Sequence, residues 1–176
     1  MKRVPVYFLF IILISMFAGC NNSKPQSIIT NPYAGRSLSI GIIGEIPKIG
    51  EKQVKFTKIQ FYDLGKEGFD SRYDAIFITK DNLSEAAQGK YASIYKKSKI
   101  PFFFIQTEKG YVPFIQEDLS YEEAAEWPDQ TYATGIIGEG DSFKFWGYGL
   151  YNDIENQENV KEVYSRIFDT ISKVKE

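Results

Sequence analysis

Two short segments that are apolar on both faces most strongly limit what this chain can fold into. Residues 75–79 and 101–106 consist mainly of β-branched and aromatic side chains, a composition typical of strands buried inside a parallel sheet. Between them lies a helical pattern, which Asn82 or Ser84 can cap and whose apolar face is formed by Ala87, Tyr91, Ile94 and Tyr95. We therefore predict a strand–helix–strand unit, and such crossovers are nearly always right-handed.

Four further strands are predicted on either side of this unit. Residues 38–43 form a compact apolar run, and residues 54–62 alternate between apolar and polar side chains with a slip near Thr57 and Lys58. Later in the chain we expect an antiparallel hairpin, with a strand over residues 131–137, a turn over 138–141 and an aromatic partner strand over 142–151.

Two more helices complete the predicted fold. Ser120 and Glu123 have the spacing of a capping box, and Pro128 would keep the helix that follows short. A longer amphipathic helix is expected to open at Asn156 and to bury Val160, Val163, Tyr164, Ile167, Ile171 and Val174. The predicted fold class is α/β, a three-layer sandwich with a mainly parallel sheet, a late antiparallel hairpin and a C-terminal amphipathic helix, in one domain over residues 38–176.

The amino-terminal residues have the pattern of a secretory signal peptide. Lys2 and Arg3 precede an apolar block over residues 4–17, which falls short of the roughly 18 to 20 apolar residues that a membrane-spanning helix needs. The block ends in Phe-Ala-Gly-Cys, and Cys20 is the only cysteine of the chain. This motif resembles the lipobox of bacterial lipoproteins. The resemblance covers about twenty residues and implies a signal peptide over residues 1–19, followed by a cysteine whose thiol carries a diacylglyceryl group.

The resemblance implies a location and a first partner. A lipidated Cys20 would anchor the chain in the lipid bilayer at the extracytoplasmic face of the cell membrane, because two acyl chains hold a protein firmly where one holds it marginally. Residues 20–37 are rich in turn formers and predict a flexible tether. Loss of Lys2 and Arg3 makes a chain of net charge −2 more acidic still, so we expect no nucleic-acid partner.

The residue types present exclude several chemistries. The chain has no histidine, which removes the usual general base at neutral pH, the Ser-His-Asp and Cys-His nucleophile systems and the common zinc sites. The glycines that follow predicted strands complete neither a dinucleotide fingerprint nor a P-loop. We therefore expect no catalytic residue, no metal and no cofactor. The acidic residues at positions 118, 122, 123, 126 and 129 are mostly expected on solvated surfaces.

Two surfaces remain as candidate binding sites. Ligands of open parallel sheets bind outside the carboxyl ends of the strands. In this sequence those ends carry Glu45, Thr79, Lys80, Asp81, Gln106, Thr107 and Glu108. The second surface is the aromatic strand, whose candidate partner-binding side chains are Trp146, Tyr148 and Tyr151. Alternate aromatic residues of a strand more often pack into a core, so their exposure decides between the two interpretations.

Three functions are compatible with the sequence. The first is a membrane-anchored, non-catalytic binding or accessory module with an envelope protein as its partner. The second is a small-ligand binder similar to one lobe of a solute-binding lipoprotein, an analogy of fold only. The third is a carboxylate-based hydrolase of envelope polymers. An exposed aromatic patch would favour the first, a pocket at the strand ends the second, and two facing carboxylates the third.

The signal sequence generates the first testable prediction. Cys20→Ser removes the thiol that would accept the lipid, so we expect the variant to leave the membrane fraction or to remain unprocessed. Membrane fractionation together with intact-protein mass spectrometry measures both effects. Unchanged membrane retention combined with a normal processed mass would contradict the lipoprotein interpretation.

Overall fold

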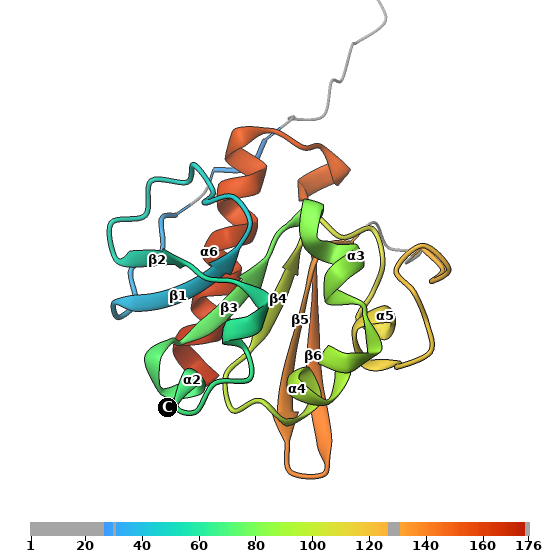
Figure 1. Ribbon diagram of the computed structural model, residues 1–176. Coiled ribbons are helices and arrows are strands. Elements are labelled where there is room, and N and C mark those ends of the chain that lie inside the picture. Colours follow the sequence, from blue (N-terminus) through green and yellow to red (C-terminus); the bar gives the residue numbers. More distant parts are fainter. Residues whose placement is uncertain (1–26, 30, 127–130, 175–176) are drawn as a thin grey trace, which may run out of the picture.

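The centre of the molecule is one six-stranded sheet with the order β2-β1-β3-β4-β5-β6 (Figure 1). The computed structural model describes residues 27–29, 31–126 and 131–174. Strands β2, β1, β3 and β4 are parallel, whereas β5 is antiparallel to β4 and to β6. The strands are β1 (Leu38–Ile43), β2 (Val54–Lys58), β3 (Ala75–Ile78), β4 (Phe102–Ile105), β5 (Thr131–Glu139) and β6 (Ser142–Gly149). The predicted mainly parallel sheet with a late antiparallel hairpin is confirmed.

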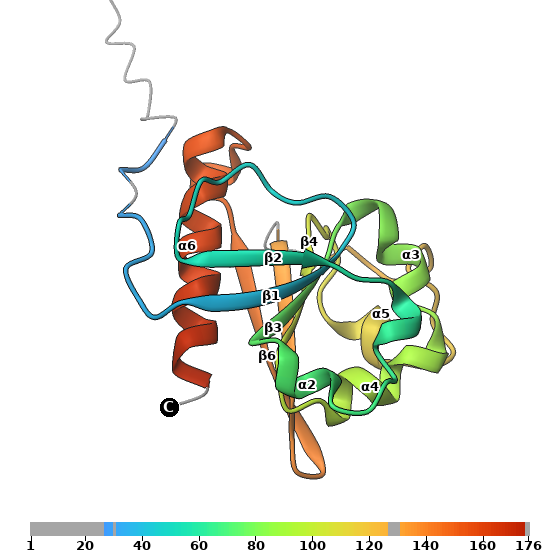
Figure 2. The same cartoon turned by 60° about the vertical axis from the view of Figure 1, so that its left-hand side comes forward.

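Helices cover both faces of this sheet and make it the middle of three layers. Figure 2 shows the long helix α6 (Gln157–Val174) on one side and the short helices on the other. The short helices are α2 (Phe69–Arg72), α3 (Leu83–Ala86), α4 (Ala92–Lys97) and α5 (Val112–Ile115). The α/β sandwich predicted from the sequence is therefore confirmed. So is the predicted opening of the last helix, because Asn156 Oδ1 accepts a hydrogen bond from the backbone N–H of Asn159 at 2.9 Å.

The two central strands divide their side chains between two hydrophobic cores. In β3, Phe77 packs on the α6 side, whereas Ile76 and Ile78 pack on the side of the short helices. In β4, Phe103 packs toward α6 and its neighbours in the strand pack toward the short helices. All of these side chains are completely buried. The two-residue period of a strand thus explains why both segments are apolar throughout.

The helix predicted between β3 and β4 is broken into two. Gln88, which separates α3 from α4, has an extended backbone with φ −66° and ψ 129°. At the next residue, a Cβ on Gly89 would lie 2.2 Å from the carbonyl oxygen of Glu117. The break therefore accommodates a close backbone approach that only glycine permits. The predicted cap residue Asn82 lies at the start of α3 but its side chain makes no capping hydrogen bond.

Other local predictions differ from the structure in extent. The strand predicted over residues 54–62 ends at Lys58, and a 3-10 turn over Phe61–Asp63 follows it. The capping box at residue 120 forms its reciprocal bonds between Ser120 and Glu123, but only a single turn follows them. Helices α2 and α5 were not predicted, because four residues are too few to show a helical period.

Part of the expected tether is packed against the domain. Tyr33 is 4% exposed and its ring meets that of Phe168 at a centroid distance of 5.7 Å. The carbonyl of Asn31 accepts a hydrogen bond from Ser165 Oγ at 3.1 Å, and the backbone N–H of Ile28 donates to Asn159 Oδ1 at 3.2 Å. The segment over residues 31–37 is thus a strap along α6, because burial of one aromatic ring outweighs the turn-forming composition around it.

The predicted signal peptide and Cys20 lie outside the described residues. Among the helices of the described ranges, none combines the length and the apolar character needed to cross a bilayer.

The stacking of Phe168 on the sheet generates a stability prediction. The ring is completely buried and lies 6.2 Å from that of Phe77 with an interplanar angle of 3°. Phe168→Ala is expected to lower the free energy of unfolding by about 3 to 5 kcal/mol, because it removes buried apolar surface and leaves a cavity. Urea denaturation followed by circular dichroism measures the change. Tyr62→Ala, at a side chain that is 71% exposed, is the control and should cost less than about 1 kcal/mol.

Candidate functional site

The parallel strands change their direction of winding between β1 and β3. After β1 the chain reaches β2 through a loop over residues 44–53, whose Ile49 belongs to the core on the α6 side. After β3 it reaches β4 through α3 and α4, which lie on the opposite face. Diverging connections of this kind leave a crevice at the carboxyl ends of the two strands, and ligands of open α/β sheets bind there.

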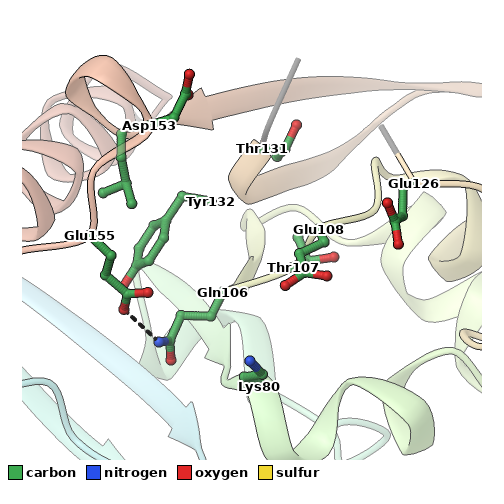
Figure 3. A pocket seen from close by; sticks show the side chains of 10 residues that line it. Lys80, Gln106, Thr107, Glu108, Glu126, Thr131, Tyr132, Asp153 and Glu155 are labelled. Atoms are coloured by element: carbon green, nitrogen blue, oxygen red, sulfur yellow. Dashed lines mark hydrogen bonds between the residues drawn. The ribbon is translucent and has the colours of Figure 1, made fainter. Parts of the chain in front are cut away.

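Two adjoining hollows occupy this end of the sheet. One has a volume of about 430 Å³ and the other about 520 Å³. Both are lined by Lys80, Gln106, Tyr132 and Glu155, so we treat them together as the strand-end cleft (Figure 3). The cleft brings together every side chain predicted from the strand ends: Glu45, Thr79, Lys80, Asp81, Gln106, Thr107 and Glu108.

The turn after β1 sets one wall of the cleft. Gly44 has φ +113°, and a Cβ there would lie 1.8 Å from Thr79 Oγ1, so this turn requires glycine. Thr79 Oγ1 donates a long hydrogen bond of 3.4 Å to the carbonyl of Ile43. Glu45 forms an ion pair of 2.9 Å with Lys58 and is well exposed. The exits of β1 and β3 are therefore joined directly at the rim.

The residues that follow β4 form the floor of the cleft. Gln106 has φ +58°, and its Nε2 donates to Glu155 Oε1 at 3.1 Å across the cleft (Figure 3). Thr107 is completely buried, and its Oγ1 accepts from the backbone N–H of Lys109 at 3.1 Å and lies 3.1 Å from the hydroxyl of Tyr121. The Thr107 hydroxyl is thus fully engaged in holding the turn, while Gln106 presents its side chain to the cleft.

The other half of the cleft consists of residues that were not predicted. They come from the start of β5, from the loop after β6, from the start of α6 and from the loop after β1, and they include Tyr132, Asp153, Glu155, Asn156 and Lys48. Because β5 is antiparallel to β4, its first residues lie at the carboxyl edge of the parallel strands. The predicted hairpin did not specify this edge, because the pairing of its first strand with β4 comes from the structure.

Left-handed backbone conformations gather around the cleft. Within the described ranges, the residues other than glycine with positive φ are Gln106 (58°), Asn152 (50°) and Asp153 (57°). Gln106 and Asp153 line the cleft, and Asn152 precedes Asp153 in the same loop. Such conformations cost about 1 to 3 kcal/mol each and cluster at functional sites, although asparagine and aspartate tolerate them better than glutamine does.

Tyr132 joins the core to the cleft. Its side chain is only 8% exposed and belongs to the core on the α6 side. Burial, with a smaller contribution from the charge of Glu155, raises the pKa of Tyr132 to about 12. The hydroxyl is therefore neutral at physiological pH and can both donate and accept a hydrogen bond.

Two of the acidic residues considered for hydrolysis, Glu122 and Glu123, are exposed and hydrogen-bonded to serine side chains. No group of three or more histidine, cysteine, aspartate or glutamate side chains in the described part of the chain could hold a metal ion. A hydrogen bond from Ser84 is the main cause that lowers the pKa of Glu122, and one from Ser120 does the same for Glu123. A general acid at neutral pH needs a raised pKa, so these two residues do not suit the hydrolase interpretation. Asp129 lies outside the described residues.

The aromatic strand packs mainly into the core. Trp146 is half-buried and stacks on Phe103 at 6.2 Å, and Tyr148 is 6% exposed with its hydroxyl donating to Thr170 Oγ1 at 2.7 Å. Tyr151 is half-buried in the turn after β6. The exposed aromatic side chain of this strand is instead Phe145, at 48%. Trp146 and Tyr148 thus pack in the core on the α6 side, whereas Tyr151 is not among the described members of either core.

The raised pKa of Tyr132 predicts a pH dependence. The neutral form is favoured in the folded protein, so its contribution to stability is complete below the unfolded pKa of 10.0 and is lost as the pH rises toward about 12. The Tyr132→Phe variant lacks this titrating group, so its free energy of unfolding should fall less steeply with pH in this window. The difference in slope between the two proteins should correspond to at most one bound proton. Urea titrations at stepped alkaline pH measure the slope. An unchanged slope would contradict the assignment, and Tyr62→Phe is the exposed control.

Comparisons with known proteins do not relate this chain to any of them. No protein-family model, no curated protein and no solved structure matches the chain.

Proposed function

We propose that this chain is a lipid-anchored, extracytoplasmic binding module of the cell envelope whose strand-end cleft binds a small polar molecule. The anchor is the diacylglyceryl group expected on Cys20. The cleft is the site, and the binding role requires no catalytic residue, metal or cofactor.

The convergence of polar groups at the cleft carries this proposal. Side chains from the exits of β1, β3 and β4, from the start of β5 and from the approach to α6 meet in one hollow at the winding reversal of the sheet. Concave sites at such points are where small molecules bind in open α/β proteins. The cleft volumes of about 430 and 520 Å³ lie within the usual range of such sites. Among the three functions considered, this geometry supports the small-ligand binder best.

The attachment of Ile28, which precedes the strap, supports a membrane-proximal cleft. Ile28 is hydrogen-bonded to Asn159 in the first turn of α6, and the neighbouring residues Asn156, Gln157 and Val160 line the cleft. The chain from Cys20 thus joins the domain beside the cleft. Seven residues, 20–26, have a contour length of at most about 25 Å. A lipid on Cys20 would therefore keep this end of the domain close to the bilayer.

The proposal predicts where a ligand will act. In the isotope-labelled full-length protein purified in detergent, a screen of small polar metabolites should produce amide shift changes that cluster at Thr79, Lys80, Gln106, Thr107 and Glu155. The changes should be saturable, and Gln106→Ala should weaken binding by about 10-fold or more, because it removes both a cleft amide and the partner of Glu155.

The hairpin tip provides the control for this experiment. The turn between β5 and β6, which consists of Gly140 and Asp141, lies at the opposite end of the sheet (Figure 1), and these two residues should not respond. The ring of Tyr111 lies 4.0 Å from that of the exposed Phe145. Saturable shifts confined to the surface around these two rings would contradict the proposed site and favour a protein-binding role instead. A screen without any saturable shift at the cleft would also contradict it.

A further inference from the structure

The charges around the strand-end cleft are uneven. Its carboxylates are Glu45, Asp81, Glu108, Glu126, Asp153 and Glu155, and its cations are Lys48 and Lys80. Only Glu45 among these carboxylates has an ion pair, which it forms with Lys58, within the described part of the chain. The resulting field favours a ligand group of positive charge. Acidic side chains alone do not define a site, but three further features of the cleft do.

The first feature is the hydroxyl of Tyr132. The side chain is more than nine-tenths buried and points into the cleft (Figure 3). Every fully buried polar side-chain atom of the described residues has a hydrogen-bond partner, whereas this hydroxyl has no partner among them. Its oxygen therefore touches the open space of the cleft. A polar group in this position is suited to bonding a ligand that enters.

The second feature is a pair of acceptors beside this hydroxyl. Gln106 donates through Nε2 to Glu155 Oε1, because a carboxylate can only accept. No other hydrogen bond to Gln106 Oε1 or Glu155 Oε2 occurs within the described residues, so both are acceptors where the two hollows meet. Together with the Tyr132 hydroxyl they match an ammonium group, which has three N–H donors and no acceptor.

The third feature is Lys80. It lies two residues after the end of β3, lines both hollows and lies beneath Gln106 in the view of Figure 3. Lys80 forms no ion pair within the described residues. An unpaired ammonium next to a set of acceptors is the arrangement that a zwitterion satisfies, since each of its charged ends then meets the opposite charge.

We propose that the strand-end cleft binds an α-amino acid with a cationic side chain. Lys80 pairs with the α-carboxylate, and Tyr132, Gln106 and Glu155 hold the α-ammonium group. The side-chain cation lies toward the outer carboxylates Glu108, Glu126 and Asp153. The inference rests on the proposed small-ligand function and names the ligand class for that site.

Four probes that differ by one charged group test this assignment by isothermal titration calorimetry on the full-length protein purified in detergent. They are L-lysine, cadaverine, L-norleucine and L-glutamate. Cadaverine lacks the carboxylate of L-lysine, L-norleucine lacks its side-chain cation, and L-glutamate reverses the charge of the side chain. We expect L-lysine to bind tightest and L-glutamate to bind at least about 10-fold more weakly.

Variants of the cleft residues then test which side chain binds each charged group of the ligand. Lys80→Met should weaken L-lysine by about 10-fold and should not weaken cadaverine, which has no carboxylate and is repelled by Lys80, so that the preference for the carboxylate disappears. Glu155→Gln should weaken the binding of L-lysine and of cadaverine by a similar factor. Tyr132→Phe should weaken the binding of both as well, and it changes the side chain by only one oxygen atom. Glu139→Gln, an exposed residue at the hairpin tip, is the matched control and should bind all four probes as the unaltered protein does.

The outcomes separate this inference from the proposed function. If L-glutamate binds in the cleft as tightly as L-lysine, or if the cleft takes only a molecule of another class in the metabolite screen, the amino-acid inference is overturned and the binding function stands. If L-lysine binds but Lys80→Met and Glu155→Gln leave its affinity unchanged, the assignment of the site is overturned. If neither the four probes nor any metabolite binds in the cleft, both proposals fall.

Discussion

The packing of α6 against the sheet is the interaction on which the rest of the structure depends. This helix covers the face of the sheet opposite to the short helices, and its Phe168 meets Phe77 from β3 and Tyr33 from the strap. It also orders the loop that borders the cleft. Asn159 Nδ2 donates to the carbonyls of Tyr151 and Ile154 at 3.2 and 2.8 Å. A single amphipathic helix thus closes one core and fixes the approach to Glu155.

The elements that could be predicted from the sequence are those whose periodicity is sustained. Strands β3 and β4 are apolar on both faces because both faces are covered, and α6 repeats its apolar stripe over 18 residues. The break at Gln88 could not be predicted, because it depends on the approach of Glu117 to Gly89 from a distant part of the chain. The burial of Tyr33 could not be predicted for the same reason, since its partner Phe168 lies far along the sequence.

Some residues of the strand-end cleft could likewise be predicted from the sequence, and others could not. Residues such as Lys80 and Gln106 follow buried parallel strands, and the common direction of those strands places them at one edge. Tyr132 required knowledge of strand register as well. Ile105 pairs with Ala133, so the reversed direction of β5 sets Tyr132 beside Gln106. Glu155 required the position of α6, which only packing of the core decides.

The left-handed backbone of Gln106 at the cleft is strained, and packing of the two cores does not require this strain. Gln106 adopts a left-handed conformation although the cores on both faces of the sheet are complete without its side chain. The hydrogen bond to Glu155 and the bond from the N–H of Thr107 to the carbonyl of Tyr132, at 3.1 Å, hold it there. A strained residue fixed from two sides keeps its amide at one orientation, which preorganises the acceptors that a ligand would meet.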